Sequence, residues 1–280
     1  MARIFFVICC LLPGLAPAGD ILVTDANGDP LAAVMVTRSV PGTDVVDTSD
    51  NGYPKPGLVN TATPRHTRFT GADGTVRFDA LDVAGDRSFR VRKQGYADAV
   101  ISAASDSESL AVSLEPLTEP RMIAESKPAN LWLAALDFSW ADDPEEYREH
   151  FLRHCGFCHQ PASVFMRTSR TEAQWRDIID RMQMYGAMAA EDLEEDLPAG
   201  LIGAFENLAL RHAELPDFEP WEPHLAEATI TEWPIGDGFS QMHDFILHPN
   251  GRVYVGDNLM DRIYALDPAT GQYEVFKVPH

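Results

Sequence analysis

The sequence predicts a multidomain protein with an N-terminal antiparallel β-sandwich, a central all-α domain and a C-terminal group of antiparallel strands. Short alternating apolar and polar runs, separated by Gly and Asp turns, fill residues 19–117. Helical periodicity replaces them over residues 121–216, and alternation returns over residues 229–280. The length of 280 residues also favours more than one domain, because domains usually hold about 100–200 residues.

Residues 1–18 read as a signal peptide. Arg3 precedes an apolar run over residues 4–12, and the small residues 16–18 (Ala-Pro-Ala) form a cleavage site before Gly19. The apolar run is too short to span a bilayer. We therefore expect a periplasmic or secreted protein without stable membrane insertion.

Four cysteines occur in the whole chain, and two of them, Cys9 and Cys10, lie in the signal peptide. Lipid attachment to one of these two is the alternative to cleavage, but neither follows a small residue. After cleavage Cys155 and Cys158 would be the only thiols left, in an oxidising compartment.

The chain is strongly acidic. It holds 22 Lys and Arg against 43 Asp and Glu, which gives a formal net charge of −21. Such a surface repels nucleic-acid phosphates and anionic membranes, so no nucleic-acid partner is expected. A basic protein partner fits this charge.

The N-terminal segment alternates apolar and polar residues in four stretches. "ILVTDANGDPLAAVMVTRS" turns at residues 27–28 (Asn-Gly), "TGADGTVRFDAL" turns at residues 73–74 (Asp-Gly), and "RSFRVRKQGYADAVIS" and "SLAVSLEP" add further strands. Residues 41–64, rich in Pro, Gly, Asn and Thr, are expected to form a long loop. These strands predict a small antiparallel sandwich.

The motifs Gly28-Asp29-Pro30-Leu31, "TGADGTVRF" and "VRKQGY" resemble carboxypeptidase regulatory-like domains over about 95 residues. In that family the module is usually structural or adhesive. The resemblance therefore implies no catalysis in this segment.

The central segment predicts three or four helices. "DDPEEYREHFLRHCGFCH" begins with the acidic residues and proline that suit a helix N-terminus. In "TEAQWRDIIDRMQMYG", Trp175, Ile178, Ile179 and Met182 follow helical offsets, with Thr171 as the expected cap and a glycine as the expected stop. "PANLWLAALDFSW" and "PAGLIGAFENLALRHAE" are the other helical stretches.

"RHCGFCHQ" holds Cys155, Cys158 and His159 in Cys-x-x-Cys-His spacing. A redox dithiol usually lies beside a βαβ pattern, which is missing here, and a zinc site would need a second pair of soft ligands. A covalent haem needs only these residues, because the two thiols add to the porphyrin vinyl groups and His159 binds iron. The motif therefore predicts haem c.

With this motif the central segment resembles the monohaem c-type cytochromes. The pattern Trp-x6-Met-x3-Gly around Met182 resembles small members in which that methionine is the second axial ligand, and methionine raises the reduction potential. Met184 and Met188 are the alternatives, followed by a histidine or an open position. The methionines that are not the ligand, among Met166, Met182, Met184 and Met188, are expected to pack in the core.

Several other residues near the motif have predicted roles in the haem site or in the surrounding fold. Trp175 would pack on the porphyrin or in the core, and Phe151 and Phe157 would line the haem pocket. Arg167 and Arg170 would bind haem propionates or lie exposed on the surface.

The acidic run "AAEDLEEDLPAG" carries five carboxylates over residues 191–196. Such a run would steer a basic redox partner, or it would simply be a solvated helix surface, which is the commoner case.

The C-terminal strands "RVYVGD", "DRIYALD" and "QYEVFKVP" are separated by turns at residues 250–251, 257–258 and 270–271. The stretch "MHDFILHPNGRVYVGDNLMDRIYALDPATGQYEVFKVP" resembles the first blade of a virginiamycin B lyase (streptogramin lyase)-like β-propeller. Propellers need typically about 4–8 blades to close. The resemblance therefore implies an incomplete propeller, either because the sequence is a fragment or because further blades come from elsewhere.

The favoured function is electron transfer by a covalently bound haem, serving an attached or partner dehydrogenase. One alternative is a propeller-based enzyme, a lyase or oxidoreductase, in which the haem domain is accessory. His243 and Asp244 are then candidates near the inner strand, and no catalytic residue is assigned. A third alternative is a binding protein whose haem senses redox state or gas.

Overall fold

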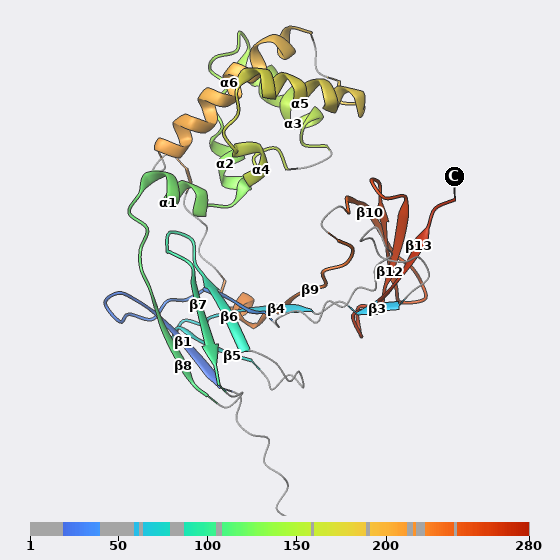
Figure 1. Ribbon diagram of the computed structural model, residues 1–280. Helices are drawn as coiled ribbons and strands as arrows, with labels where there is room; N and C mark the ends of the chain where they lie inside the picture. The colour runs from blue at the N-terminus through green and yellow to red at the C-terminus, as the bar shows by residue number, and fades with distance from the viewer. Residues whose placement is uncertain are drawn as a thin grey trace, which may run out of the picture. The chain divides into compact units, whose positions relative to one another are not determined.

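The chain forms two compact units in a computed structural model. The structure describes residues 19–39, 59–61, 64–78, 87–104, 108–157, 160–188, 191–211, 215–216, 222–237 and 240–279. The first unit combines Met1–Val91, Ala99–Ser113 and Pro223–His280, and the second combines Arg92–Asp98 and Leu114–Glu222 (Figure 1). The predicted signal peptide lies outside the described residues.

Two sheets of the first unit use the N-terminal strands. A three-stranded sheet has the order β5-β1-β8, and a five-stranded sheet has the order β7-β6-β2-β4-β9. Their bounds are β1 Asp20–Asp25, β2 Met35–Ser39, β4 Arg65–Phe69, β5 Thr75–Arg77, β6 Arg87–Arg92, β7 Ala99–Ala103, β8 Leu110–Leu114 and β9 Ile230–Glu232. Alternation places one apolar set inside, including Val23, Val36 and Val91, which have no exposed surface.

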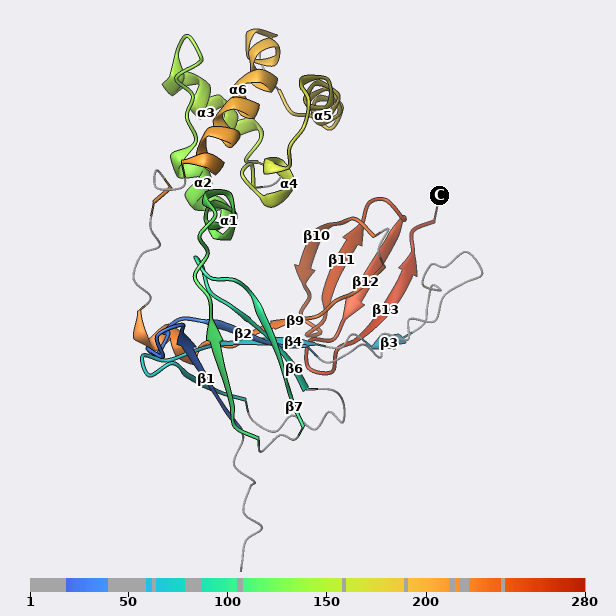
Figure 2. The ribbon, with the colours of Figure 1, turned by 60° about the vertical axis from the view of Figure 1, so that its left-hand side comes forward.

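A third sheet contains the C-terminal strands and has the order β10-β11-β12-β13-β3 (Figure 2). The bounds are β3 Val59–Thr61, β10 Met242–Leu247, β11 Val253–Asp257, β12 Arg262–Leu266 and β13 Gln272–Lys277. The meander of β10 to β13 was predicted, and its predicted turns connect the strands. Tyr264, Leu266, Tyr273 and Val275 form the buried cluster of this sheet.

The second unit holds the helices. Their bounds are α1 Pro120–Ser126, α2 Ala129–Ala135, α3 Pro144–His154, α4 Val164–Arg167, α5 Glu172–Met184 and α6 Glu191–Leu210, and a 3-10 turn in the first unit covers Pro223–Glu227. Helix α6 packs against α1 and α5. No described helix has the length and apolar character needed to cross a membrane.

The predicted fold class is wrong. The protein is mostly β-sheet, and no central all-α cytochrome c domain is evident in the part of the chain that the structure describes. The helical unit also takes in Arg92–Asp98, where Tyr96 forms a β-bridge with Pro116. The prediction assumed that each stretch of uniform periodicity folds as one module.

The strand segments also do not form a separate sandwich and a separate propeller blade. Strand β9 follows the helices in sequence but pairs with β4, and β3 comes from the predicted long loop yet pairs with β13. Strand edges pair through backbone groups that every residue carries, so side-chain periodicity gives no information on which edge a distant strand joins. Because each predicted segment contributes a strand to a sheet of the other, the N-terminal and C-terminal strands form one unit and not two independent domains.

Candidate functional site

Helix α3 ends directly before the Cys-x-x-Cys-His motif. The Asp143 carboxylate accepts a hydrogen bond from the Glu146 N–H at 3.1 Å, and Pro144 occupies the first helical position. These residues confirm the predicted start of the helix. Phe151, on its inner face, is buried and fixes the orientation of the last turn.

Cys155 is the C-cap of α3. Its N–H donates to the Phe151 carbonyl at 2.9 Å, and its half-buried side chain packs against the core of the helical unit. Burial raises the pKa of the Cys155 thiol to about 11. Cys158 and His159 lie outside the described residues.

Gly156 shapes the motif's backbone, and it was not singled out from the sequence. Its N–H donates to the Leu152 carbonyl at 3.1 Å, and a Cβ on Gly156 would meet that carbonyl oxygen at 2.4 Å. Only glycine allows this close approach. The glycine between the two cysteines was the sequence signal for this close approach. It allows the chain to leave helix α3 directly after Cys155.

Helix α5 carries the predicted axial methionine, Met182. A capping box joins Thr171 and Gln174 at its start, which confirms the predicted cap. At its end Gly186 has a φ of 100°, and the N–H of Ala187 donates to the Met182 carbonyl at 3.0 Å. This Schellman motif confirms the predicted stop and holds the backbone of Met182 in place.

The candidate methionines differ in exposure. Met182 is half-buried on the helix face that carries Trp175, whereas Met184 and Met188 are 79% and 72% exposed. Met166 is buried in the core, as predicted for a packing residue. Trp175 is buried in the same cluster, against which Cys155 packs.

Neither predicted role of Arg167 fits the structure. Its side chain is buried, forms an ion pair with Glu125 at 2.9 Å and lies 4.4 Å from the centre of the Trp132 ring. The guanidinium also donates to the Ala162 carbonyl at 2.8 Å. Arg167 therefore stabilises the helical unit instead of binding propionates or lying on the surface.

Arg170 connects α4 to α5. Its guanidinium lies 4.6 Å from the ring centre of Phe165 and 5.1 Å from that of Trp175, and it donates to two backbone carbonyls. These stacking contacts make Arg170 half-buried. It holds the segment after the motif against the start of α5.

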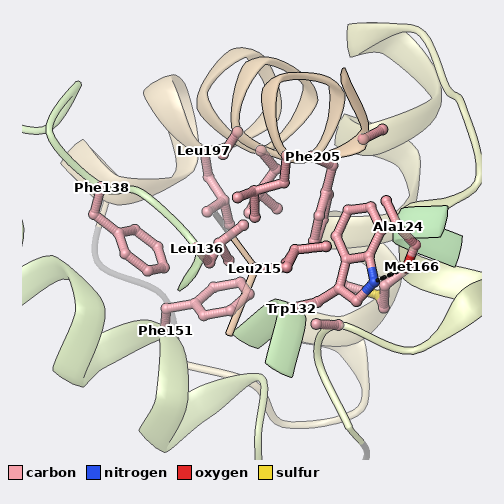
Figure 3. Packing of buried hydrophobic residues seen from close by; sticks show 14 of the residues in the cluster. Ala124, Trp132, Leu136, Phe138, Phe151, Met166, Leu197, Phe205 and Leu215 are labelled. Carbon is pink, nitrogen blue, oxygen red and sulfur yellow. Dashed lines mark hydrogen bonds between the residues drawn. The ribbon is translucent and has the colours of Figure 1, made fainter. Parts of the chain in front are cut away.

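The apolar core of the helical unit is closed. Trp132 has no exposed surface, and its indole N–H donates to the Ala124 carbonyl at 2.9 Å (Figure 3). A small open recess beside Trp132 and Trp175 has about 20 Å³ of room, enough for a water molecule. Phe151, predicted to line a haem pocket, is buried in this core.

A second set of apolar side chains in this unit is exposed. Its members lie within three residues of Cys155, on α4, or at the C-terminal end of α5. The set, which we call the exposed apolar set, consists of Phe157, Val164, Phe165, Met184, Tyr185 and Met188. Phe157, inside the motif, is the most exposed of them at 87%.

His150 and His154 lie one turn apart on α3, immediately before the motif. Their rings meet edge to face with centroids 5.7 Å apart, and both side chains are half-buried. Both side chains therefore lie partly against the helical unit and partly in solvent. Among the described residues, no group of three or more His, Cys, Asp or Glu side chains is arranged to hold a metal ion.

His243 and Asp244, the enzyme candidates, lie next to each other on β10. The His243 Nδ1 and an Asp244 carboxylate oxygen are 3.0 Å apart, and both side chains are largely exposed. On α6 the side chains of Glu195 and Asp196 are also exposed, while those of residues 191–194 lie outside the description.

Comparison with family models, with curated proteins and with solved structures finds no match for this chain.

Proposed function

We propose that this chain is an exported haem protein that transfers electrons. Cys155 and Cys158 would bind haem c covalently, and His159 and Met182 would be the axial ligands. The motif spacing supports the two thioether bonds, because Cys-x-x-Cys-His is the signature of covalent haem attachment.

The exposed apolar set is the observation that carries the proposal. Large apolar side chains gathered on a surface mark a binding site, because leaving them in water is unfavourable. Here they flank Cys155 and the end of α5, the two places where the chain offers haem ligands. Phe157 lies two residues after Cys155, so a flat apolar ring attached at Cys155 would cover its side chain.

A haem attached at Cys155 would lie on the surface of the helical unit and not inside its closed core. The recess beside Trp132 holds little more than a water molecule, so it has no room for a porphyrin. Cys155 is held at the end of α3 on the core that also packs Trp175. The attachment point and the helix of Met182 therefore share one rigid support.

Among the methionines, Met182 fits the axial position best. It is half-buried, and the Schellman motif fixes its backbone, whereas Met184 and Met188 point largely into solvent. A ligand held by its backbone loses less conformational freedom when it binds. A haem bound there would supply reversible one-electron oxidation and reduction, with His159 and Met182 filling both axial positions.

The acidic surface supports a basic redox partner. A net charge of −21 attracts a basic protein and speeds its encounter at low salt. The electron donor would be a periplasmic dehydrogenase. The predicted signal peptide agrees with that compartment.

The proposal is tested on the full chain exported from a host that attaches haem c. We expect an intact mass increased by one haem and a pyridine haemochrome spectrum typical of two thioether bonds. Cys155→Ser should leave one such bond. A colourless chain with unmodified thiols, or with a Cys155–Cys158 disulfide, contradicts the proposal.

The axial ligand is tested by three matched variants. Met182→Ala should abolish the methionine–iron charge-transfer band and turn the iron high-spin, while Met184→Ala and Met188→Ala should keep the wild-type spectrum. If Met182→Ala keeps the band and one of the other two loses it, the assignment of Met182 is wrong.

A further inference from the structure

Among the residues that the structure describes, no strand pairs with the outer edge of β10. Strand β10 is the terminal strand of its sheet, and all six of its residues are exposed, although its sequence MHDFIL is mostly apolar (Figure 2). Exposed edges of this kind are usually protected by Lys, Pro or inward charges. Here a β-bulge between Met242 and Phe245 and the exposed Asp244 carboxylate protect one part of the strand, and residues 245–247 remain regular.

Both faces of the strand are apolar at this edge. Phe245 and Leu247 extend one face of the sheet and are 80% and 68% exposed, and Ile246 extends the other at 63%. A strand that covers this edge must therefore be apolar on both of its own faces. β10 itself has this property.

The backbone at the edge is oriented for pairing. The His248 N–H donates to the Arg252 carbonyl at 2.9 Å, so the backbone groups of residue 248 face β11. In an antiparallel ladder this direction alternates from one residue to the next. The backbone groups of Ile246 therefore also face β11, and those of Phe245 and Leu247 face the open edge.

We propose that β10 pairs antiparallel with β10 of a second copy of this chain, about a twofold axis at Ile246. In this register Phe245 lies opposite Leu247 of the second copy, and their outward backbone groups exchange two hydrogen bonds. The same pair recurs on the other side of the axis, which is the symmetry expected of a dimer. The two sheets become one continuous sheet.

Hydrogen-bonding side chains favour this register. It brings Asp244, which lies in the bulge and contacts the His243 ring at 3.0 Å, close to His248 of the second copy. The His248 Nδ1 accepts a hydrogen bond from the Asn250 N–H at 3.3 Å, so the neutral ring carries its proton on Nε2 and can donate to a carboxylate. An axis at residue 244 would instead oppose two carboxylates, and an axis at Phe245 would leave Asp244 facing Ile246.

The overall charge of −21 opposes association at low ionic strength. The test is therefore made at about 0.15 M salt, where charges farther apart than about 8 Å are screened. Sedimentation velocity of the full chain over a concentration series should show a monomer–dimer equilibrium. A chain that remains monomeric at every concentration overturns the proposal.

The variant Leu247→Lys places a charge in the pairing and should raise the dimer dissociation constant at least about tenfold. Val100→Lys is the matched control, because Val100 lies on the edge strand β7 of another sheet and is also 68% exposed. This control should dimerise like the wild type. Equal dissociation constants for the two variants overturn the proposal, and circular dichroism checks that both fold.

The register is tested by exchanging its charges. His248→Asp should weaken the dimer because it opposes two carboxylates, and the double variant Asp244→Lys with His248→Asp should restore the dimer. A double variant as weak as the single one overturns the register. A wild-type monomer that instead pairs with an added apolar peptide strand would assign the edge to another protein.

Discussion

The helical unit contains two groups of apolar side chains with opposite surroundings. The cluster around Trp132 is closed, and the largest of its side chains have almost no exposed surface (Figure 3). The exposed apolar set around Cys155 and the end of α5 has residues of similar size, yet most of their surface meets solvent. Sequence alone does not distinguish the groups, because both consist of aromatic and aliphatic residues.

The difference separates folding from function. The closed cluster obtains its packing partners from the chain itself, so it stabilises the unit without a ligand. The exposed apolar set has few such partners among the described residues, the Arg170 guanidinium over the Phe165 ring being one, and contributes little to stability by itself. Substitutions in the first group should therefore change the free energy of unfolding, and those in the second should change haem binding.

The largest effect is expected at the centre of the closed cluster. Trp132→Ala should lower the free energy of unfolding by about 4 kcal/mol, because it leaves a cavity and removes the hydrogen bond to Ala124. Chemical denaturation of the haem-free chain measures this. Tyr185→Ala, a large aromatic residue of the exposed apolar set, is the control. Equal losses of unfolding free energy in Trp132→Ala and Tyr185→Ala would contradict the distinction between the closed cluster and the exposed apolar set.

Cys155 lies at the border of the two groups. Because burial raises the pKa of its thiol from 9.0 to about 11, the thiolate fraction at pH 8 should be about 100-fold lower than in the unfolded chain. In a haem-free Cys158→Ser variant, iodoacetamide should therefore react about 100-fold more slowly with the folded chain than with the chain in denaturant. Similar alkylation rates in the folded chain and in denaturant would show that the Cys155 thiol is exposed, like the exposed apolar set.

The same shift fixes the direction of a pH effect on stability. The folded state holds the proton of Cys155 more tightly than the unfolded state does. Its contribution to stability is therefore complete below pH 9 and is lost as the pH rises towards about 11. Cys155→Ser should reduce this loss, and an unchanged pH profile in that variant would show that other groups cause it.

The ion pair of Arg167 tests a smaller contribution to the closed cluster. Glu125→Gln removes the carboxylate that the buried guanidinium contacts at 2.9 Å, while Trp132 and the Ala162 carbonyl remain as partners. We expect a loss of about 2 kcal/mol in the free energy of unfolding, as for a hydrogen bond to a charged group. Added salt should change this loss little, since the pair is partly buried.

Local features of the helical unit could be predicted from the sequence. The cap at Thr171, the stop at Gly186 and the start of α3 at Pro144 were predicted correctly, because each depends on residues within four positions. Trp175 was predicted to pack on the porphyrin or in the core, and it is buried in the core cluster. The burial of Arg167 was not predicted, because its partner Glu125 lies 42 positions away.

The assembly of the sheets could not be predicted for the same reason. β3 and β9 are three-residue strands whose pairing partners are far along the chain. Their short sequences carry no periodicity that distinguishes a strand from a loop. Gly156 shows the opposite case, since its role follows from a contact four residues away and the motif already contained the signal.

The smallest effect on stability is expected at Phe157, the most exposed residue of the exposed apolar set. Phe157→Ala should lower the free energy of unfolding of the haem-free chain by about 0.5 kcal/mol or less, because the ring is 87% exposed and packs against little. In the haem-loaded chain the loss should be larger, since the haem would bury this ring and each buried CH₂ contributes about 0.8 kcal/mol. Denaturation of both forms measures the two losses. Equal small losses of unfolding free energy in both forms would show that the haem does not contact Phe157. A large loss without haem would show that Phe157 packs in the closed cluster.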